Sequence, residues 1–310
     1  MQSLPSVSVV VPVLNGEVTI GDMLRAITAC SPRPSQLEII VVDNGSSDAT
    51  PEIVSRCDGV TLLSEPRRGA AAARNTGLRH ATGDVILHCD ADTLPTRRWI
   101  AELASCFSDP TVTLAAGRTL NFPPTTPAER YLAGFQLYDA EVNINRPVLP
   151  FAASMNMAVR RSAALAIGGW NEEMMTSEDV DFCTRLLAGY PTAISYAPNA
   201  VLFHRNRSSD AALKRQAWSY GEGVADTYRR YPDVVPWGGV QYAHLTRNLI
   251  SRSLAPLWWR LRSAFSTGDR NEAERASYHR MWTWWFWRGF FSFQRSGKYR
   301  TEWTATTRTQ

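Results

Sequence analysis

Short apolar runs alternate with amphipathic stretches over the first 120 residues. The runs at 7–11, 38–42, 60–63 and 84–89 have the length and β-branched character of buried strands. Between them, apolar residues recur at helical spacing, as at Ile20, Met23, Leu24 and Ile27. Further helices are expected at 50–57, 69–80 and 96–107, and a further strand at 112–116. Strands that alternate with helices predict βαβ units and a mostly parallel sheet, an α/β fold.

The pattern changes after residue 118. Prolines punctuate residues 119–150, which we expect to form a mobile or variable insertion. A strand is then expected at 155–159, a helix at 177–187 and an extended segment at 193–203. From about Lys214 the chain is helical in character, basic and rich in tryptophan.

Charge is spread unevenly along the 310 residues, although the formal net charge is only +4. Residues 1–204 hold 15 Lys/Arg and 21 Asp/Glu, a net of −6, whereas residues 205–310 hold 18 and 8, a net of +10. Such asymmetry indicates either an anionic partner for the basic part or a solvated basic face. Aromatic residues fill the stretch 281–293, and basic residues flank it. This composition suits a membrane interface, but it equally suits a helix that packs against protein. No nucleic-acid partner is expected, because no such module is evident.

The five cysteines contain no Cys-x-x-Cys pair, so neither a zinc site nor a disulfide framework is indicated. Residues 1–5 lack a basic segment followed by an apolar core, and no run reaches the roughly 18 apolar residues of a spanning helix. We therefore expect a cytoplasmic protein with reduced thiols, with peripheral contact to the inner face of the cell membrane as the alternative.

Carboxylates follow two of the predicted strands. Asp43 closes the strand at 38–42, and Asp90-Ala91-Asp92 follows the strand at 84–89. Parallel strands end at one sheet edge, so these groups are predicted to face one crevice. Oxygen-rich positions of this kind suit Mg²⁺ or Mn²⁺ held together with a diphosphate. The alternative for Asp43-Asn44-Gly45 is a simple turn.

A second acidic pair, Glu178-Asp179, opens the predicted helix at 177–187. Negative charge at that position also stabilises a helix start, so a purely structural role stays open. Asp181 is expected to pair with Arg185, four residues further along the same helix.

The order of these segments resembles family 2 glycosyltransferases of the GT-A (Rossmann-like) fold. The similarity covers roughly residues 7–207 and rests on six segments in order. They are Val9–Glu17, Val41–Asp48, Gly69 with Ala73–Gly77, Asp90-Ala91-Asp92, Gly168–Glu172 and Ser177–Arg185. The chain departs from the usual pattern at Leu14, where tyrosine is common, and at Trp170-Asn171, which replaces Phe-Asp.

The resemblance implies a role for each matching position. Asp179 would be the catalytic base, with Glu178 beside it. Asp92 would bind Mn²⁺ or Mg²⁺, with Asp90 facing the ribose or the metal and His204 helping to bind metal or diphosphate. The nucleotide-sugar donor would lie against the remaining positions, which are Pro12, Asn15, Glu17, Asp43, Gly69, Arg74, Asp90, Ala91 and Asn156.

The resemblance also implies a domain organisation. Residues 1–207 would form the catalytic domain, with the nucleotide-sugar part at about 1–118 and the acceptor side at about 119–207. Beyond the resemblance, the composition of residues 208–310 predicts a helical, basic and aromatic extension.

The implied chemistry is sugar transfer with inversion. A divalent cation would neutralise the leaving diphosphate, and a carboxylate would deprotonate the acceptor hydroxyl. The expected acceptor is a saccharide, a lipid-linked glycan or a small molecule. Two alternatives stay open: a polyprenyl-phosphate sugar transferase at the membrane surface, and a degenerate nucleotide-sugar-binding or scaffold protein.

Overall fold

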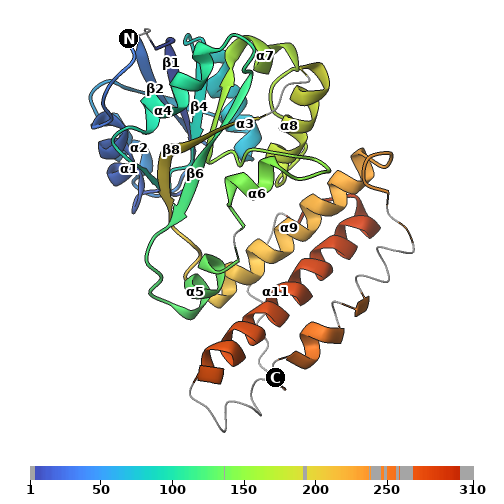
Figure 1. Ribbon diagram of the computed structural model, residues 1–310. Coiled ribbons are helices and arrows are strands. Elements are labelled where there is room, and N and C mark those ends of the chain that lie inside the picture. Colours follow the sequence, from blue (N-terminus) through green and yellow to red (C-terminus); the bar gives the residue numbers. More distant parts are fainter. Residues whose placement is uncertain are drawn as a thin grey trace. The chain divides into compact units, whose positions relative to one another are not determined.

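The computed structural model describes residues 4–135, 137–190, 194–236, 238, 246–247, 250–255, 258 and 268–300. The chain divides into two compact units, whose elements are labelled in Figure 1. The sheet unit extends to residue 206, except for 126–131 and 175–177. Those two segments belong with the residues from 207 onward to the helical unit.

Among the described residues, eight strands form one mixed sheet in the order β3-β2-β1-β4-β7-β6-β8-β5. The pairs β1–β2, β2–β3, β1–β4 and β6–β8 are parallel, and the other three are antiparallel. The predicted α/β fold with a mostly parallel sheet is thereby confirmed. The strands are β1 (Val7–Val13), β2 (Leu37–Asp43), β3 (Val60–Ser64), β4 (Val85–Cys89), β5 (Thr93–Pro95), β6 (Leu114–Asn121), β7 (Asn156–Arg160) and β8 (Ser195–His204).

Helices cover both faces of the sheet. Because side chains alternate along a strand, Val9 and Val11 of β1 join the core on one face, with Ile20 and Ile100, while Val10 joins the other. On that second face a Cβ at Gly77 would lie 2.3 Å from Val10, so the glycine permits the close approach of helix to strand. The helices of this unit are α1 (Ile20–Thr28), α2 (Thr50–Ser55), α3 (Ala70–His80), α4 (Trp99–Ser105), α6 (Ala140–Ile144), α7 (Arg161–Ala166) and α8 (Glu178–Gly189). Most of α5 (Pro127–Ala133) lies in the segment 126–131, which belongs to the helical unit.

The segment 119–150, expected as a mobile or variable insertion, contains the end of β6 and the short helices α5 and α6. A cap explains why α6 begins where it does, since Asp139 Oδ1 accepts a hydrogen bond from Val142 N at 3.1 Å. The three-residue strand β5 was not anticipated. It forms because Thr93–Pro95 pairs with the end of β8. That partner is more than 100 residues away in the sequence, so the residues near Thr93 do not indicate the pairing.

The helical unit is built around α9 (Asp210–Arg230) and α11 (Gly268–Ser296). The two helices approach closely at two glycines: a Cβ at Gly221 would lie 1.9 Å from Phe286 O, and one at Gly289 would lie 2.1 Å from Trp218 O. Most aromatic residues of 281–293 therefore pack within this unit, and Phe290 and Phe293 are buried. None of the helices in the described residues is long and apolar enough to cross a membrane.

Candidate functional site

The loops that follow β1 and β2 are fastened to each other by polar side chains. Asn15 adopts a left-handed conformation with φ 53°. Its N–H donates to Ser46 Oγ at 2.8 Å, and its Oδ1 accepts from Ser47 N at 2.9 Å. Glu17 Oε2 accepts from Ala49 N at 3.1 Å. Asn15 and Glu17, both predicted to border a nucleotide, thus fix the shape of these two loops.

Asp43 lies at the end of β2, buried to 8% exposure, and its carboxylate accepts from Gly45 N and Ser46 N. Asp43 therefore stabilises the turn that follows β2, as the alternative interpretation of this segment predicted. The neighbouring Asn44 accepts from Gly69 N at 2.8 Å, which brings the start of α3 to the same edge. Pro12 lies one strand away in β1, where it pairs with Val42.

The end of β4 meets the loop after β1. A Cβ placed on Gly16 would lie 3.6 Å from the Ala91 Cβ, so the two loops are in contact. Asp90 and Asp92 flank Ala91 in a tight turn, in which Thr93 N donates to Asp90 O at 3.1 Å. The carboxylates after β2 and β4 therefore share one edge of the sheet, as the strand pattern predicted.

Arg74 joins this edge to the helix α8. Its Nη2 donates to Asp90 at 2.9 Å and its Nη1 to Glu178 at 2.7 Å, although only 2% of the residue is exposed. Burial acts against the positive charge, but the two carboxylates outweigh it and raise the pKa of Arg74. Two acidic motifs 88 residues apart in the chain thus meet at one buried guanidinium.

Asp179 stands beside that ion-pair network, in the first turn of α8. It accepts weakly from Ser154 N at 3.4 Å and from Val180 N at 2.9 Å. Burial, together with the adjacent negative charge of Glu178, raises the pKa of Asp179 to about 7, against the opposing effect of Arg74. A carboxylate whose pKa lies near neutrality is suited to accept a proton from an acceptor hydroxyl.

An aromatic residue supports the network, a role not anticipated from the sequence. The Arg74 guanidinium lies 4.9 Å from the Trp170 ring centroid, and Trp170 in turn stacks on Phe182 at 4.3 Å. The edge of Trp170 meets His88 at 5.1 Å. Trp170 had been noted as a departure from the family pattern, but its place beneath Arg74 depends on tertiary packing.

Asp92 faces the end of β8. His204 Nε2 lies 3.9 Å from Asp92 Oδ2, and the Tyr138 ring meets the His204 ring at 4.7 Å. A cation shared by the two residues could span that distance, because ligand bonds to Mg²⁺ are about 2.1 Å each. Within the described ranges, no group of three or more His, Cys, Asp or Glu side chains is arranged to hold a metal ion. Among the described residues, Asp92 and His204 are thus a pair of potential donors, and a cation bound there would need further oxygen ligands from elsewhere.

Asn156 begins β7 and pairs with Cys89, next to Asp90. Its Oδ1 accepts from Trp99 Nε1 at 2.8 Å, and its Nδ2 donates to Thr119 and to Ala200 O at 3.3 and 3.4 Å. The amide that was predicted to lie beneath the donor sugar is therefore fixed from below by the protein. Asp181 pairs with Arg185 at 2.8 Å, which confirms its structural role.

The geometry brings the predicted residues into three adjoining groups along one edge of the sheet. One comprises the loops after β1 and β2, one the Arg74 network with Asp179, and one Asp92 with His204. Tyr138 and Trp170 complete this edge, and neither was among the predicted site residues.

Comparisons with known proteins give the same picture. The sequence model described as Glycosyl transferase family 2 matches residues 8–168. The chain is 31% identical over 239 residues to a pre-mycofactocin glycosyltransferase of Mycobacterium tuberculosis, covering 73% of this chain and 48% of that protein. It is 31% identical over 222 residues to the glycosyltransferase AglE of Haloferax volcanii, covering 69% and 71%.

A structural relative agrees over more of the chain. The mannosyltransferase PcManGT from Pyrobaculum calidifontis, solved in complex with GDP-Man and Mn²⁺, is 25% identical with a TM-score of 0.62. The match covers 91% of this chain and 86% of that one. The chain spans about half the length of the mycobacterial relative, however, so the comparison establishes the family and the fold and nothing more specific.

Proposed function

The chain belongs to glycosyl transferase family 2 and has the GT-A fold, and on that basis we propose that it transfers a sugar from a nucleotide-diphosphate donor to an acceptor hydroxyl. The observation that carries the proposal is the buried contact of Arg74 with both Asp90 and Glu178. That contact brings Asp90, which follows β4, close to the start of α8. A transferase needs its donor-binding groups and its base to lie close together in this way.

Asp179 is the proposed general base. Its position beside the Arg74 network, together with a pKa near 7, supports proton removal from the attacking hydroxyl. Glu178 is the proposed positioning residue, because its carboxylate is held by Arg74 and its charge helps to raise the pKa of Asp179.

The proposed metal ligands are Asp92 and His204, with Asp90 facing the metal or the ribose. Mn²⁺ or Mg²⁺ held there would supply Lewis acidity toward the leaving diphosphate. The structural relative that was solved with Mn²⁺ and GDP-Man supports the use of a divalent cation. The loops fastened by Asn15, Glu17 and Asp43 would bear the nucleotide, and Gly69, Ala91 and Asn156 would lie close to the donor.

Inversion at the anomeric carbon is the proposed stereochemical outcome. The acceptor oxygen forms its bond to that carbon as the carbon–diphosphate bond breaks, and the hydroxyl proton passes to Asp179. A single displacement needs one base and no enzyme nucleophile, and the site supplies that base.

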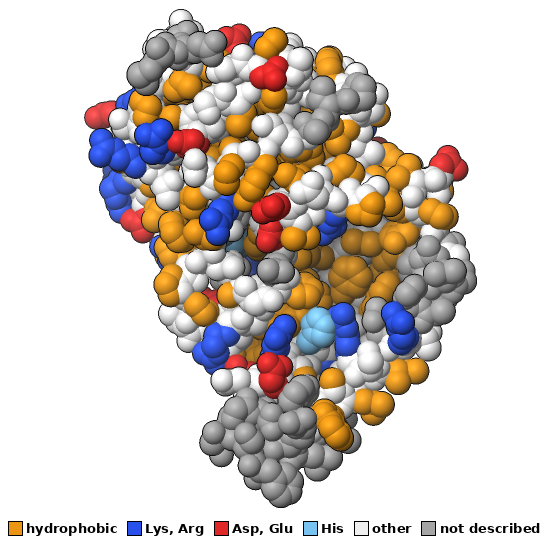
Figure 2. All heavy atoms as spheres, viewed as in Figure 1, with side chains coloured by type: hydrophobic (Ala, Val, Ile, Leu, Met, Phe, Trp, Pro, Cys, Tyr) orange, Lys and Arg blue, Asp and Glu red, His pale blue; other side chains and the backbone are white. Residues whose placement is uncertain are grey.

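Contact with an anionic membrane surface is a second element of the proposal. Ile250, Leu254 and Trp258, the apolar row, are four residues apart and are 57%, 60% and 60% exposed. Trp284 is 50% exposed, and its Nε1 donates to Ser253 Oγ next to this row. On the face of the helical unit seen in Figure 2, Lys and Arg side chains lie among hydrophobic ones. Such a mixture is typical of interfacial helices.

This surface keeps a polyprenyl-phosphate acceptor as the alternative substrate, because a lipid-linked acceptor would reach the site from a membrane. A scaffold without activity is less well supported, because Asp90, Asp92 and Asp179 are all present and lie along one edge of the sheet.

Nucleotide release tests the proposal. The intact chain is incubated with a panel of nucleotide sugars that includes GDP-mannose, with Mn²⁺ or with EDTA. We expect slow release from one donor in Mn²⁺ and its loss in EDTA. Failure of every donor to be hydrolysed or to shift the melting temperature would contradict a transferase and favour a scaffold.

Substitution of Asp179 tests its assignment as the general base. Asp179→Asn should lower transfer by at least about a thousandfold while donor binding persists, because the amide cannot accept the proton. Asp58→Asn, an exposed substitution of the same kind, is the matched control. Transfer that persists in Asp179→Asn would show that another group is the base.

A further inference from the structure

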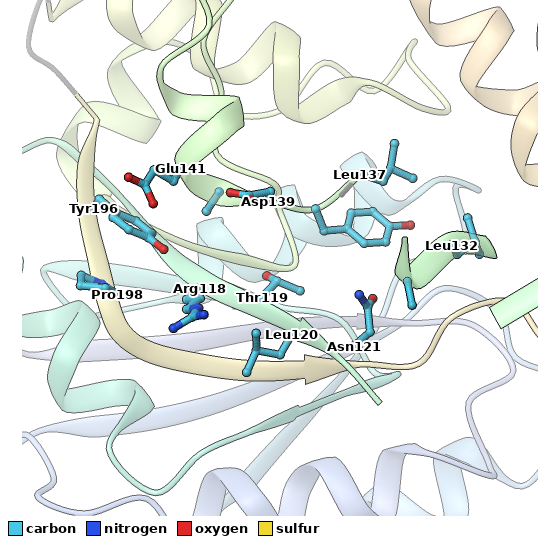
Figure 3. Close-up of a pocket in the computed structure, with 13 residues that line it drawn as sticks. Arg118, Thr119, Leu120, Asn121, Leu132, Leu137, Asp139, Glu141, Tyr196 and Pro198 are labelled. Carbon is cyan, nitrogen blue, oxygen red and sulfur yellow. The ribbon is translucent and has the colours of Figure 1, made fainter. Parts of the chain in front are cut away.

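A trough of about 360 Å³ runs along β6 on the sheet unit. Its walls come from β6, the start of β8, α6 and the segment that joins α5 to α6, as Figure 3 shows. We call it the β6 trough. Most of its lining residues lie in the region 119–150, within the part of the chain that the resemblance assigns to the acceptor side.

Charged and aromatic side chains from three elements line the trough. Arg118 comes from β6, Asp139 and Glu141 from the beginning of α6, and Tyr196 from β8. Burial raises the pKa of the Tyr196 hydroxyl, while Arg118 opposes that shift and Glu141 and Asp139 add to it. The charged groups Arg118, Asp139 and Glu141 therefore lie close enough to Tyr196 to influence its hydroxyl.

One end of the trough reaches the proposed catalytic edge. Tyr138, which lines the trough, meets the His204 ring at 4.7 Å. Asn121, another lining residue, pairs with His204 across β6 and β8. Thr119 accepts a hydrogen bond from Asn156. A molecule in the trough would thus extend toward His204, a proposed metal ligand, and toward Asn156, which is proposed to lie close to the donor.

The lining suits a neutral sugar. Carboxylates accept hydrogen bonds from hydroxyls, guanidinium groups donate to ring and hydroxyl oxygens, and tyrosine rings pack against the apolar face of a pyranose. Two carboxylates stand against one guanidinium, so the trough carries a net negative charge that disfavours a phosphate or uronate. Asp139 Oδ1 already caps α6, which leaves Glu141 as the carboxylate with most freedom to bind.

We infer that the β6 trough is an acceptor subsite for an uncharged saccharide, held by Glu141, Arg118 and Tyr196. The inference rests on the proposed glycosyltransferase function and specifies its acceptor class. It favours a neutral glycan over a polyprenyl phosphate at the acceptor end, because the lining carries more acids than bases.

Binding of the intact chain to a glycan panel tests the subsite. The panel contains neutral di- to tetrasaccharides, uronate-containing and phosphorylated oligosaccharides, and undecaprenyl phosphate in detergent. We expect a neutral member to bind best. Its Kd should rise about tenfold or more in Glu141→Lys and in Tyr196→Ala, the loss that accompanies removal of a strong polar or stacking contact.

The matched control is Glu52→Lys, which makes the same change of charge on an exposed face of α2 and should leave the Kd unchanged. Circular dichroism and melting of each variant show that the chain is folded, and Glu141→Gln, which retains the shape, serves where Glu141→Lys does not fold. Binding of nucleotide sugars to the unaltered chain reports separately on the proposed function. Donor binding without any neutral-glycan binding would overturn the subsite alone. An anionic member binding best, or equal Kd values in the trough variants and control, would also overturn it.

Discussion

At the scale of single residues, Asp179 is controlled by groups from several elements. Glu178 precedes it on α8, Arg74 approaches from α3, Ser154 N donates from the segment before β7, and Arg146 faces it from the segment after α6. Burial is the largest effect and favours the protonated carboxyl. The same residue type on an exposed helix start would be ionised at neutral pH and would be a weak base.

This environment predicts a pH profile for transfer. Because the pKa of Asp179 is raised to about 7, the base is protonated below that pH, so kcat/KM should rise about tenfold per unit up to pH 7 and level off above it. Initial rates measured from pH 5 to 9 in buffers of constant ionic strength test this. A profile flat from pH 5 to 7 would contradict the assigned environment.

Stability should move in the opposite direction. Between the ordinary pKa of about 3.8 and the folded value of about 7, the folded state binds the proton more tightly than the unfolded chain does. The contribution of Asp179 to the free energy of unfolding therefore falls as pH rises through that window. Asp179→Asn should remove this slope, which melting curves at pH 5 and 8 would show.

At the scale of elements, α3 holds β4 and α8 together through Arg74. We predict that Arg74→Gln lowers the free energy of unfolding by about 3 kcal/mol, because it leaves partly buried carboxylates without their cation. Arg79→Gln alters the same helix at a half-exposed site and should cost no more than about 0.5 kcal/mol. Urea denaturation of both variants measures the difference, and equal losses would show that the Arg74 network is not stabilising.

The pair of long helices in the other unit depends on small residues. Gly221→Ala should cost about 1–3 kcal/mol, because its Cβ would lie 1.9 Å from Phe286 O and force α9 away from α11. Gly189→Ala is the control, since a Cβ there meets nothing within 4 Å. Thermal melts compare the two. A melting temperature unchanged in Gly221→Ala would mean that the helices pack less closely than described.

At the scale of the whole molecule, residues 205–310 carry a net charge of +10, and many of their basic side chains are exposed at the surface. The buried Asp226 is bonded by Arg229 and Arg230, and the partly exposed Glu274 by Arg130. Basic side chains on α11 and just beyond it are exposed, and they are Arg280, Arg288, Arg295 and Lys298. Asp226 and Glu274 form ion pairs within the unit, whereas these basic side chains are exposed to solvent. This distribution of charge favours attraction to an anionic surface.

Vesicle sedimentation tests that attraction. The intact chain should sediment with vesicles that contain phosphatidylglycerol and much less with phosphatidylcholine alone, and the bound fraction should fall as salt rises. Trp258→Ser with Trp284→Ser should reduce the bound fraction severalfold, because both rings are exposed. Val18→Ser, which removes an exposed apolar side chain from the sheet unit, is the control. Equal sedimentation with both lipids would refute the membrane proposal.

Much of the fold was readable from the chain because it depends on local patterns. Short, β-branched apolar runs, helical spacing and polar strand ends gave the strands from β1 to β4, the helices between them and the sheet edge that carries Asp43 and Asp90. These features depend on residues near one another in sequence, where backbone geometry fixes which side chains share a face. The strand β5 is different, because its partner, the end of β8, lies far along the chain. The helices α5 and α6 are too short to show a clear helical repeat of apolar residues.

The sequence alone also determined the acidic motifs and their order, because residue types and strand ends can be recognised from neighbouring positions in the chain. Only the tertiary structure decided that Arg74 joins Asp90 to Glu178, that Trp170 lies beneath it and that a trough opens beside His204. The physical reason is that burial and proximity of charge set these properties, including the raised pKa of Asp179. Both arise only when segments distant in sequence pack together and exclude water.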